Sequence, residues 1–457
     1  MRGRALLPQT LVARLSAAAT ALALVPIWFF RYFPTVDGPS HLYNSFVLAH
    51  YFDPGSVVIR DYFIVNFRLF PNWTIYLLMS PLLRLMQPLI VQRIILSICV
   101  VSIPAAVVYL QKSFKGNTDA FSLLGVLVVY SDMLFMGFFN FIIAATLFAI
   151  ALGFWWRRRN NRYLYGLYGL LILVYLSHAL AYAAALLAIG LLAATERRWR
   201  TLLELIPAFA LFAIDALARP KGELIYRGPR WLARQPLVFF GTGHILIAVA
   251  ILLLIVTAIL FTLTRSRANR AALVSAVLLI LYCIAPWGYV SEGLEQAAYV
   301  NERLLFLIIL TLPAWIVVPR VQIAMALLLF AIAVQLSVAT VQIAKLSPYI
   351  DGIVRCSVLI RPHSTIQTFY APSMTTQITP ALHLNSYLAL QTDVVDVDDY
   401  EARLRDFPLA YRANIVGRPS DYAVIWRGAP IRQVAGYKII FDNGQMRLLQ
   451  RYASPPP

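Results

Sequence analysis

Long apolar runs separated by short polar segments dominate the pattern of this chain. The first run extends from Leu15 to Phe33, and about ten further runs approach the roughly 20 residues that cross a bilayer as a helix. These further runs cover residues 90–110, 119–134, 138–156, 163–178, 179–194, 201–217, 244–264, 271–290, 304–318 and 321–341. The pattern predicts a polytopic α-helical membrane protein with about eleven spanning helices in residues 1–345.

A long polar and aromatic segment, residues 34–88, separates the first run from the second, and we expect it to form a loop outside the membrane. Its most apolar part, residues 72–86, contains Pro81 and Arg84. If that part crossed the membrane, the basic segments that follow the next predicted helices could not both face the cytoplasm. We therefore expect residues 72–86 to lie along the membrane surface as an interfacial helix.

The composition changes in residues 346–457, which are predicted to form a small extracytoplasmic α/β domain at the C-terminus. Residues 422–426 and 437–441 have the aromatic and β-branched side chains of strands, and Asp442 to Gly444 is typical of a hairpin turn. The acidic stretch 398–401 is expected to be a solvated helix start with an aspartate at the cap.

Composition supports a membrane protein and argues against a nucleic-acid partner. The 457 residues are 60% hydrophobic and 13% charged, whereas soluble proteins are nearer half apolar and a quarter charged. The mean hydropathy is +0.71. The formal net charge is +18, but the basic residues cluster where predicted helices end, as expected of a multi-pass protein of the cell inner (plasma) membrane with a cytoplasmic N-terminus. The predicted cytoplasmic joints hold Lys112/Lys115, Arg157–Arg159, Arg197/Arg198/Arg200, Arg265/Arg267/Arg270 and Arg320.

Several familiar signatures are absent from the sequence. The three cysteines lie far apart, so they indicate neither a disulfide framework nor a metal-ligand spacing. The chain has no Gly-Lys-Ser/Thr phosphate loop and no His-Glu-x-x-His box, which argues against nucleotide hydrolysis and against a zinc-protease site. No motif therefore indicates a cofactor, although the carboxylates described next permit a divalent metal ion.

Asp37 is the first candidate for chemistry, because it closely follows the first apolar run and precedes Gly38 and Pro39. Those two residues predict a turn after which Ser40 caps a helix, so that His41 lies about one helical turn behind Asp37. A carboxylate in that position can accept a proton from an acceptor hydroxyl or help to hold a metal ion. The alternative is an ordinary helix cap in a solvated loop.

Asp132 is the second candidate, since it lies in the next predicted outer turn. Asp132 and Asp37 could share a general-base or metal-binding role; alternatively, Asp132 caps a helix. His178 ends the predicted helix 163–178 and could donate a hydrogen bond to a phosphate, although such a histidine is more often a packing residue.

A basic segment supplies candidate ligands for a lipid phosphate. Residues 219–234 carry five positive charges in a predicted outer loop, three of them at Arg227, Arg230 and Arg234. With the tryptophan among them, these charges suit a phosphate at the membrane interface, unless the segment is only a soluble loop. Arg303 opens a predicted helix on the same side, where it could clamp a phosphate or form a surface pair with the preceding glutamate.

In its arrangement the chain resembles the GT-C superfamily of polyprenyl-phosphate-sugar glycosyltransferases, which includes the protein O-mannosyltransferases and the lipid A aminoarabinose transferase. The resemblance covers most of residues 1–345 and implies that Asp37 is the catalytic aspartate of the first outer loop. Asp132 matches an aspartate that some members have in the next outer turn. Gly38 replaces a second acidic residue found in many members, and His178 stands where many have a lysine near the lipid phosphate.

The resemblance implies an inverting transfer of a sugar from a polyprenyl-phosphate donor to a hydroxyl of an extracytoplasmic acceptor, which could be lipid A, a polysaccharide or a protein. Asp37 would act as general base, while His41, His178 and the outer arginines would stabilise the phosphate charge. One alternative is a transporter or flippase for lipid-linked saccharides, although we see no paired inverted repeats. Another is a non-catalytic membrane protein of envelope assembly.

Overall fold

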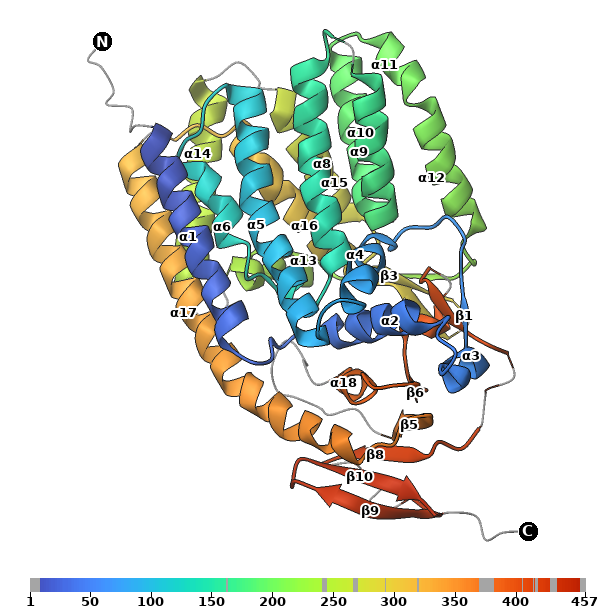
Figure 1. Ribbon diagram of the computed structural model, residues 1–457. Coiled ribbons are helices and arrows are strands. Elements are labelled where there is room, and N and C mark those ends of the chain that lie inside the picture. Colours follow the sequence, from blue (N-terminus) through green and yellow to red (C-terminus); the bar gives the residue numbers. More distant parts are fainter. Residues whose placement is uncertain are drawn as a thin grey trace. The chain divides into compact units, whose positions relative to one another are not determined.

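The computed structural model describes residues 9–452 except 162, 241–244, 266–269, 292, 319, 370–381, 405, 414, 416–417 and 428–433. Arg267, one of the predicted basic joints, lies outside the described residues. The chain divides into two compact units, whose elements are labelled in Figure 1. Unit 1 comprises Met1–Val25, Ser97–Met133 and Asn140–Thr340, and unit 2 comprises Pro26–Leu96, Leu134–Phe139 and Val341–Pro457.

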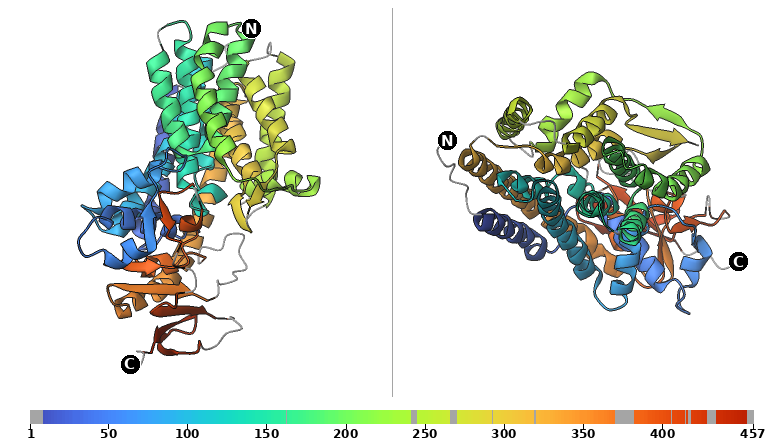
Figure 2. Two further views of the ribbon diagram at one scale, coloured as in Figure 1. Left: turned by 90° about the vertical axis from the view of Figure 1, so that its right-hand side faces the viewer. Right: turned by 90° about the horizontal axis from the view of Figure 1, so that it is seen from above.

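Unit 1 is a bundle of helices, several of which are seen nearly end-on in the right-hand view of Figure 2. Its helices, some of which continue into unit 2, are α1 (Gln9–Phe29), α5 (Pro88–Lys115), η1 (Ala120–Leu123), α6 (Leu124–Leu127), α7 (Asp132–Phe135), α8 (Phe139–Arg158), α9 (Leu164–Ser177), α10 (Ala179–Thr195), α11 (Trp199–Glu204), α12 (Ile206–Ala218), α13 (Pro229–Phe240), α14 (Ile245–Arg265), α15 (Arg270–Ile284), α16 (Val300–Thr311), η2 (Leu312–Ala314) and α17 (Val321–Val354). A small antiparallel sheet in the order β2-β3-β4 joins Glu223–Ile225, Gly288–Ser291 and Leu294–Ala297.

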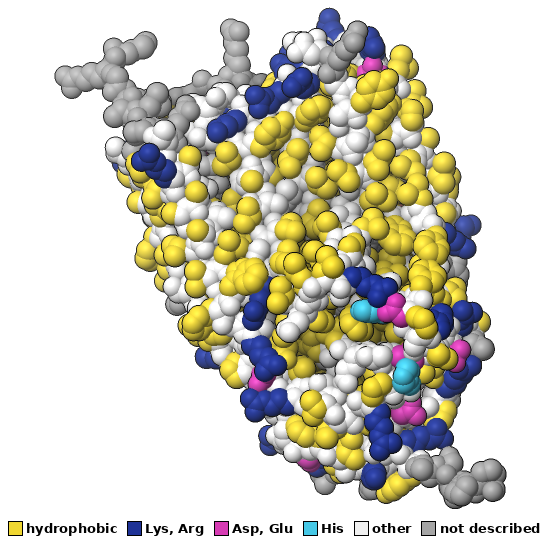
Figure 3. Space-filling view, viewed as in Figure 1, with side chains coloured by type: hydrophobic (Ala, Val, Ile, Leu, Met, Phe, Trp, Pro, Cys, Tyr) yellow, Lys and Arg dark blue, Asp and Glu magenta, His cyan; other side chains and the backbone are white. Residues whose placement is uncertain are grey.

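Within the described part of the chain, six helices are long and apolar enough to cross a membrane, which fits a helical membrane protein. The most apolar stretch of α8 is 78% buried, whereas that of α14 is 28% buried. Helix α8 is therefore central in its bundle, and α14 leaves most of its apolar surface uncovered. On the face shown in Figure 3, hydrophobic side chains cover much of the surface of the helices.

Most of the predicted helices are confirmed to within a few residues. The clearest cases are 90–110, 138–156, 163–178, 179–194 and 244–264, which correspond to α5, α8, α9, α10 and α14. The predicted helix 321–341 is too short, because α17 continues to Val354. Ile343, Ile350 and Ile353 are buried along this extension at helical spacing, so an amphipathic pattern continues the helix beyond the long apolar run.

Three other predicted helices differ from the structure. The predicted helix 119–134 is broken into η1, α6 and α7, and the side chain of Asp119 caps the tight first turn by accepting from the backbone N–H of Phe121. The predicted helix 271–290 ends at Ile284, because Pro286 disfavours helical conformation in the residue before it. The predicted helix 304–318 ends as α16 and η2, with Pro313 inside η2.

The basic segment predicted as an outer loop is not a plain loop. It contains strand β2 and helix α13, whose arginines at positions 230 and 234 share one face. Phe239 and Phe240 are buried near the end of the same helix. The alternation of arginines with Leu232, Phe239 and Phe240 fits an amphipathic helix. The high density of positive charge had suggested a loop instead.

Unit 2 is built around a mixed five-stranded sheet with the strand order β6-β5-β8-β10-β9 (Figures 1 and 2). Strands β6, β5 and β8 are parallel, and β8, β10 and β9 are antiparallel. A separate antiparallel pair joins β1 to β7. The elements of unit 2 are α2 (Gly38–His50), α3 (Val57–Tyr62), β1 (Phe63–Val65), α4 (Thr74–Leu83), η3 (Arg355–Leu359), β5 (Ser364–Thr368), α18 (Asn385–Leu388), β6 (Val394–Asp396), η4 (Glu401–Arg403), β7 (Leu409–Tyr411), β8 (Tyr422–Trp426), β9 (Tyr437–Asp442) and β10 (Met446–Arg451).

The predicted strands and hairpin near the C-terminus are confirmed. Tyr422–Trp426 is β8, and the turn that begins at Asp442 connects β9 to β10. The acidic stretch 398–401 does lead into a short helix, η4, but its N-cap is Tyr400 rather than an aspartate, and the prediction that the stretch is solvated is wrong. Asp399 is 1% exposed and Glu401 is fully buried. The strand pair β1–β7 links this region to residues 63–65, which is a contact that no local pattern encodes.

Candidate functional site

Asp37 occupies the N-cap position of α2, yet its side chain makes no capping hydrogen bond. Helix α2 begins at Gly38 with Pro39 in its first turn, so the prediction that Ser40 caps this helix is wrong. Ser40 lies inside the helix and is buried. Pro39 fixes the first turn without needing a backbone donor, and the carboxylate of Asp37 is thereby left for other partners.

The backbone around Asp37 is tied to the short segment before α8. The N–H of Val36 donates to the carbonyl of Phe135 at 2.9 Å, and that of Asp37 donates to the carbonyl of Met136 at 3.0 Å. Gly137 has a φ of 79°, and a Cβ there would lie 2.6 Å from the backbone nitrogen of Gly38. Only glycine fits this approach, which fixes the position of Asp37.

Two aromatic residues of the C-terminal region contact the Asp37 carboxylate, whose side chain is 15% exposed. The Nε2 atom of His383 lies 3.6 Å from Oδ1, and the Tyr400 side chain shares a hydrogen bond with Asp37. The rings of His383 and Tyr400 stack with their centroids 4.6 Å apart. Burial lowers the pKa of His383 to about 4, and His41 adds to this effect, so the ring is neutral at physiological pH.

A second layer of charge lies behind Asp37, between α2 and the tail. His41 is 4% exposed, and its Nδ1 lies 2.7 Å from Oε1 of Glu401 and 2.9 Å from the hydroxyl of Tyr76. Tyr76 also donates a hydrogen bond to Glu401. Burial by itself lowers the pKa of His41, but the carboxylates of Glu401 and Asp37 together raise it above its ordinary value. We call Asp37, His41, His383, Tyr400 and Glu401 the Asp37 cluster.

Two further carboxylates support the Asp37 cluster from the same stretch. Burial and the nearby Glu401 carboxylate raise the pKa of Asp399 well above its ordinary value. The Asp399 side chain is also hydrogen-bonded to Asn44 of α2. Asp396 is held by Asn385 at 2.7 and 2.8 Å, and burial raises its pKa to about 7. Burying several carboxylates together lowers the stability of the fold, because each loses its hydration. Clusters of buried acids with shifted pKa values are typical of functional sites.

The chemical capacity of the Asp37 cluster follows from this arrangement. Asp37 combines a partly exposed carboxylate with fixed backbone geometry, which is what a general base needs. The neutral His383 can take a proton onward or hold a hydroxyl near the carboxylate. His41 and Glu401 are too deeply buried to meet a substrate, so their role is to fix the position and the charge state of Asp37.

In unit 1, Asp132 begins α7 and lies close enough to Glu302 for the two carboxylates to repel each other. Glu302 is 9% exposed and accepts a hydrogen bond from the indole of Trp287 at 3.3 Å. The guanidinium of Arg227 lies 4.1 Å from the ring centroid of Trp287. Trp287 therefore contacts Glu302 and Arg227, and Asp132 lies near that glutamate.

The other predicted phosphate ligands of unit 1 lie around Phe141. The guanidinium of Arg303 lies 5.7 Å from its ring centroid and donates to the carbonyl of Ala298 at 2.8 Å. The ring of His178 meets Phe141 edge-on at 5.3 Å, and its Nδ1 accepts from the N–H of Leu180, which caps α10. The Nε2 of a neutral His178 consequently carries its proton and is a donor.

Within the Asp37 cluster, the sequence singled out Asp37 and His41, whereas His383, Tyr400 and Glu401 were not among the candidates. His41 was predicted as a phosphate ligand, but it is 4% exposed and pairs with Glu401 instead. Asp37 and Asp132 fall in different compact units. Arg230 and Arg234 are exposed on α13. Tyr400 and Glu401 had one signal in the sequence, which is the run of acids beside an aromatic at 398–401, whereas His383 had none. No described set of three or more His, Cys, Asp or Glu side chains is arranged to hold a metal ion.

The pH dependence of stability tests the environment of His383. Its pKa falls from 6.5 to about 4 on folding, so the unfolded chain binds a proton first as the pH falls. The free energy of unfolding therefore has its full value above pH 6.5. It falls by roughly 3 kcal/mol in total as the pH drops from about 6.5 to 4. We expect His383→Gln to flatten the fall of Tm between pH 7.5 and 4.5 in detergent. The surface variant His50→Gln should keep the wild-type slope, and equal slopes for all three proteins would show that His383 is not a buried neutral ring.

Comparisons of the chain with family models, with curated proteins and with solved structures found no match.

Proposed function

We propose that this chain is a GT-C-like membrane glycosyltransferase that moves a sugar from a polyprenyl-phosphate donor to a hydroxyl of an extracytoplasmic acceptor. The main support for this proposal is the environment of the Asp37 carboxylate. It lies at a helix start without serving as a cap, it is partly exposed, and His383 and Tyr400 hold it in place. The arrangement suits a base that meets a substrate from one side only.

The proposed reaction is a single displacement at the anomeric carbon. The acceptor oxygen bonds to that carbon as the bond to the phosphate oxygen breaks, and the polyprenyl phosphate leaves with the electron pair. Asp37 takes the proton of the acceptor hydroxyl. The negative charge that develops on the leaving phosphate requires cations or hydrogen-bond donors that face it, because such groups lower the barrier.

We also propose a membrane topology for the chain. The chain would have about eleven spans, a cytoplasmic N-terminus and an extracytoplasmic tail, since the basic joints favour that orientation. Helix α4 has ten residues and reaches about 15 Å, which is half of a bilayer core. Its length supports an interfacial position, in agreement with the basic joints.

Loss of the basic segment is expected to weaken donor binding. In an Arg227/Arg230/Arg234→Ala triple variant we expect the Kd for a polyprenyl-phosphate sugar to rise by about tenfold or more, since each charge near a membrane surface contributes about 1 kcal/mol. The matched control is Arg157/Arg158/Arg200→Ala, which also removes three exposed arginines. Binding to nanodisc-embedded protein measures the effect. An unchanged Kd in the first variant would remove α13 and the segment before it from the donor site.

Cleavage of the donor tests the proposed function. Purified protein should release polyprenyl phosphate from one member of a panel of radiolabelled polyprenyl-phosphate sugars, as the sugar is transferred to an acceptor or, more slowly, to water. A flippase would move the lipid between leaflets and leave the sugar attached.

A further inference from the structure

Three arginines from separate parts of unit 1 converge on Glu196. The Nε atoms of Arg159 and Arg198 lie 3.5 and 3.7 Å from its Oε2, and Arg270 contacts its other oxygen. Arg159 directly follows α8, Arg198 precedes α11, and Arg270 begins α15. The Glu196 side chain is only 11% exposed, so one carboxylate faces three guanidinium groups with little water around it.

Local backbone geometry builds this cluster. Helix α10 ends in a Schellman motif, in which the N–H of Arg198 donates to the carbonyl of Ala193 at 2.8 Å and that of Arg197 to Ala194 at 3.0 Å. Arg197 has a φ of 55°, a left-handed conformation that usually requires glycine. The turn brings Glu196 and Arg198 to the same point, and an arginine occupies the position where glycine would be unstrained.

Positive charge exceeds negative charge at these helix ends. Besides Glu196, the described residues of the segments that supply this cluster (157–159, 196–204 and 270) include seven arginines and one further carboxylate, Glu204, which pairs with Arg200 at 2.8 Å. The seven are Arg157, Arg158, Arg159, Arg197, Arg198, Arg200 and Arg270. Helix-end arginines are expected from topology alone, and they stabilise helix C-termini. Arg270 gains nothing in this way, because it stands at a helix N-terminus.

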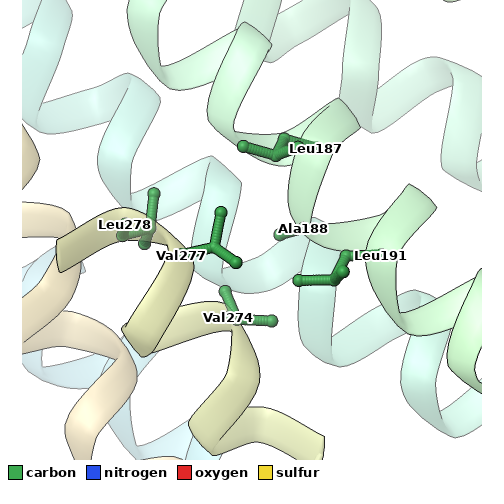
Figure 4. A pocket seen from close by; sticks show the side chains of 6 residues that line it. All are labelled: Leu187, Ala188, Leu191, Val274, Val277 and Leu278. Atoms are coloured by element: carbon green, nitrogen blue, oxygen red, sulfur yellow. The ribbon is translucent and has the colours of Figure 1, made fainter. Parts of the chain in front are cut away.

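A narrow, shallow apolar groove lies between α10 and α15, about one turn away from the cluster. Figure 4 shows its lining, which consists of Leu187, Ala188 and Leu191 from α10 and Val274, Val277 and Leu278 from α15. Leu191 precedes Glu196 by five residues and Val274 follows Arg270 by four, so each lies about 6–8 Å along its helix from the charged end. The same two helices thus supply both the charged end and the apolar groove.

We infer that the Arg159–Arg198–Arg270 cluster and the groove between α10 and α15 form a binding site for one anionic phospholipid. The phosphate engages the guanidinium groups in place of part of the Glu196 contact, and an acyl chain lies along the six aliphatic side chains. Arginine forks match phosphate oxygens, and basic pockets between membrane helices bind such head groups. Trp199, which is 65% exposed beside Arg198, is typical of a membrane interface. The site is independent of the proposed glycosyl transfer.

Lipid titration of the purified protein tests this site. Using native mass spectrometry of the full chain in detergent, we expect phosphatidylglycerol to bind about tenfold more tightly than phosphatidylcholine. The Arg198→Gln/Arg270→Gln double variant should lose that preference. The matched Arg157→Gln/Arg158→Gln variant should keep it, because neither arginine contacts Glu196.

Two more variants keep the test independent of misfolding. Glu196→Gln should bind phosphatidylglycerol more tightly than wild type, since it removes the competing carboxylate, and a damaged fold cannot produce a gain. Val277→Trp should weaken binding by filling the groove while leaving every charge in place. The inference fails if phosphatidylglycerol shows no preference, if both double variants lose it equally, or if Glu196→Gln binds less. It also fails if inorganic phosphate competes and Val277→Trp has no effect, because that result indicates a site for free phosphate.

Discussion

Replacing Asp37 by asparagine is expected to lower the rate of sugar transfer by about 10²- to 10⁴-fold, the usual contribution of a positioned general base. The amide cannot take the acceptor proton, but it keeps the size of the side chain and can still accept a hydrogen bond from Tyr400. The fold should survive, because the carboxylate makes no capping hydrogen bond and the backbone contacts of Asp37 are unaffected. Transfer rates and Tm, measured on the same preparation, check both parts.

Asp53→Asn is the matched control for this substitution. Asp53 lies in the same unit and pairs with Arg84 at 2.7 Å, but its side chain is exposed and lies outside the Asp37 cluster. We expect its transfer rate to equal that of wild type. A wild-type rate in Asp37→Asn, or an equal loss in both variants, would contradict the assigned role of Asp37.

Loss of the Glu401 carboxylate is expected to have the largest effect on stability. Glu401→Gln should destabilise the protein by about 3–5 kcal/mol, because His41 and Tyr76 would remain buried without their shared acceptor. The pKa of folded His41 is raised, so the stability it contributes is present below pH 6.5 and is lost as the pH rises through the raised value. The variant should therefore lose this alkaline fall in Tm as well as lowering Tm overall.

The control for Glu401 is an ion pair of the same type at the surface. Asp442 pairs with Arg447 at 2.8 Å, with both side chains well exposed. Asp442→Asn should leave Tm unchanged, since exposed pairs contribute little. If Glu401→Gln melted at the wild-type temperature with the wild-type pH dependence, the His41–Glu401 pair would not organise this part of the molecule.

The sequence was most informative where a single helix or hairpin decides the structure. The apolar runs predicted α5, α8, α9, α10 and α14 because an apolar helix depends only on local hydrophobicity. The hairpin of β9 and β10 followed from the turn that begins at Asp442. These features depend on neighbours within a few residues.

The candidate site was only partly predictable because its members are brought together across the chain. Asp37 and His41 stood out near the end of the first apolar run, whereas Glu401 looked like a solvated acid in a polar tail. The structure buries Glu401 against α2, more than 350 positions away, and brings His383 to Asp37 over a similar separation. Hydrophobic periodicity carries no information about such pairings.

Turnover of polyprenyl-phosphate sugars by the purified protein is the most direct test of the proposed function. A panel of radiolabelled donors is incubated with wild type, Asp37→Asn and Asp53→Asn in nanodiscs, and the released polyprenyl phosphate is counted. We predict release from one donor by wild type and Asp53→Asn, and at least about 100-fold less by Asp37→Asn. Absence of release from every donor, together with lipid binding that survives Asp37→Asn, would contradict a glycosyltransferase and favour a flippase or an assembly protein.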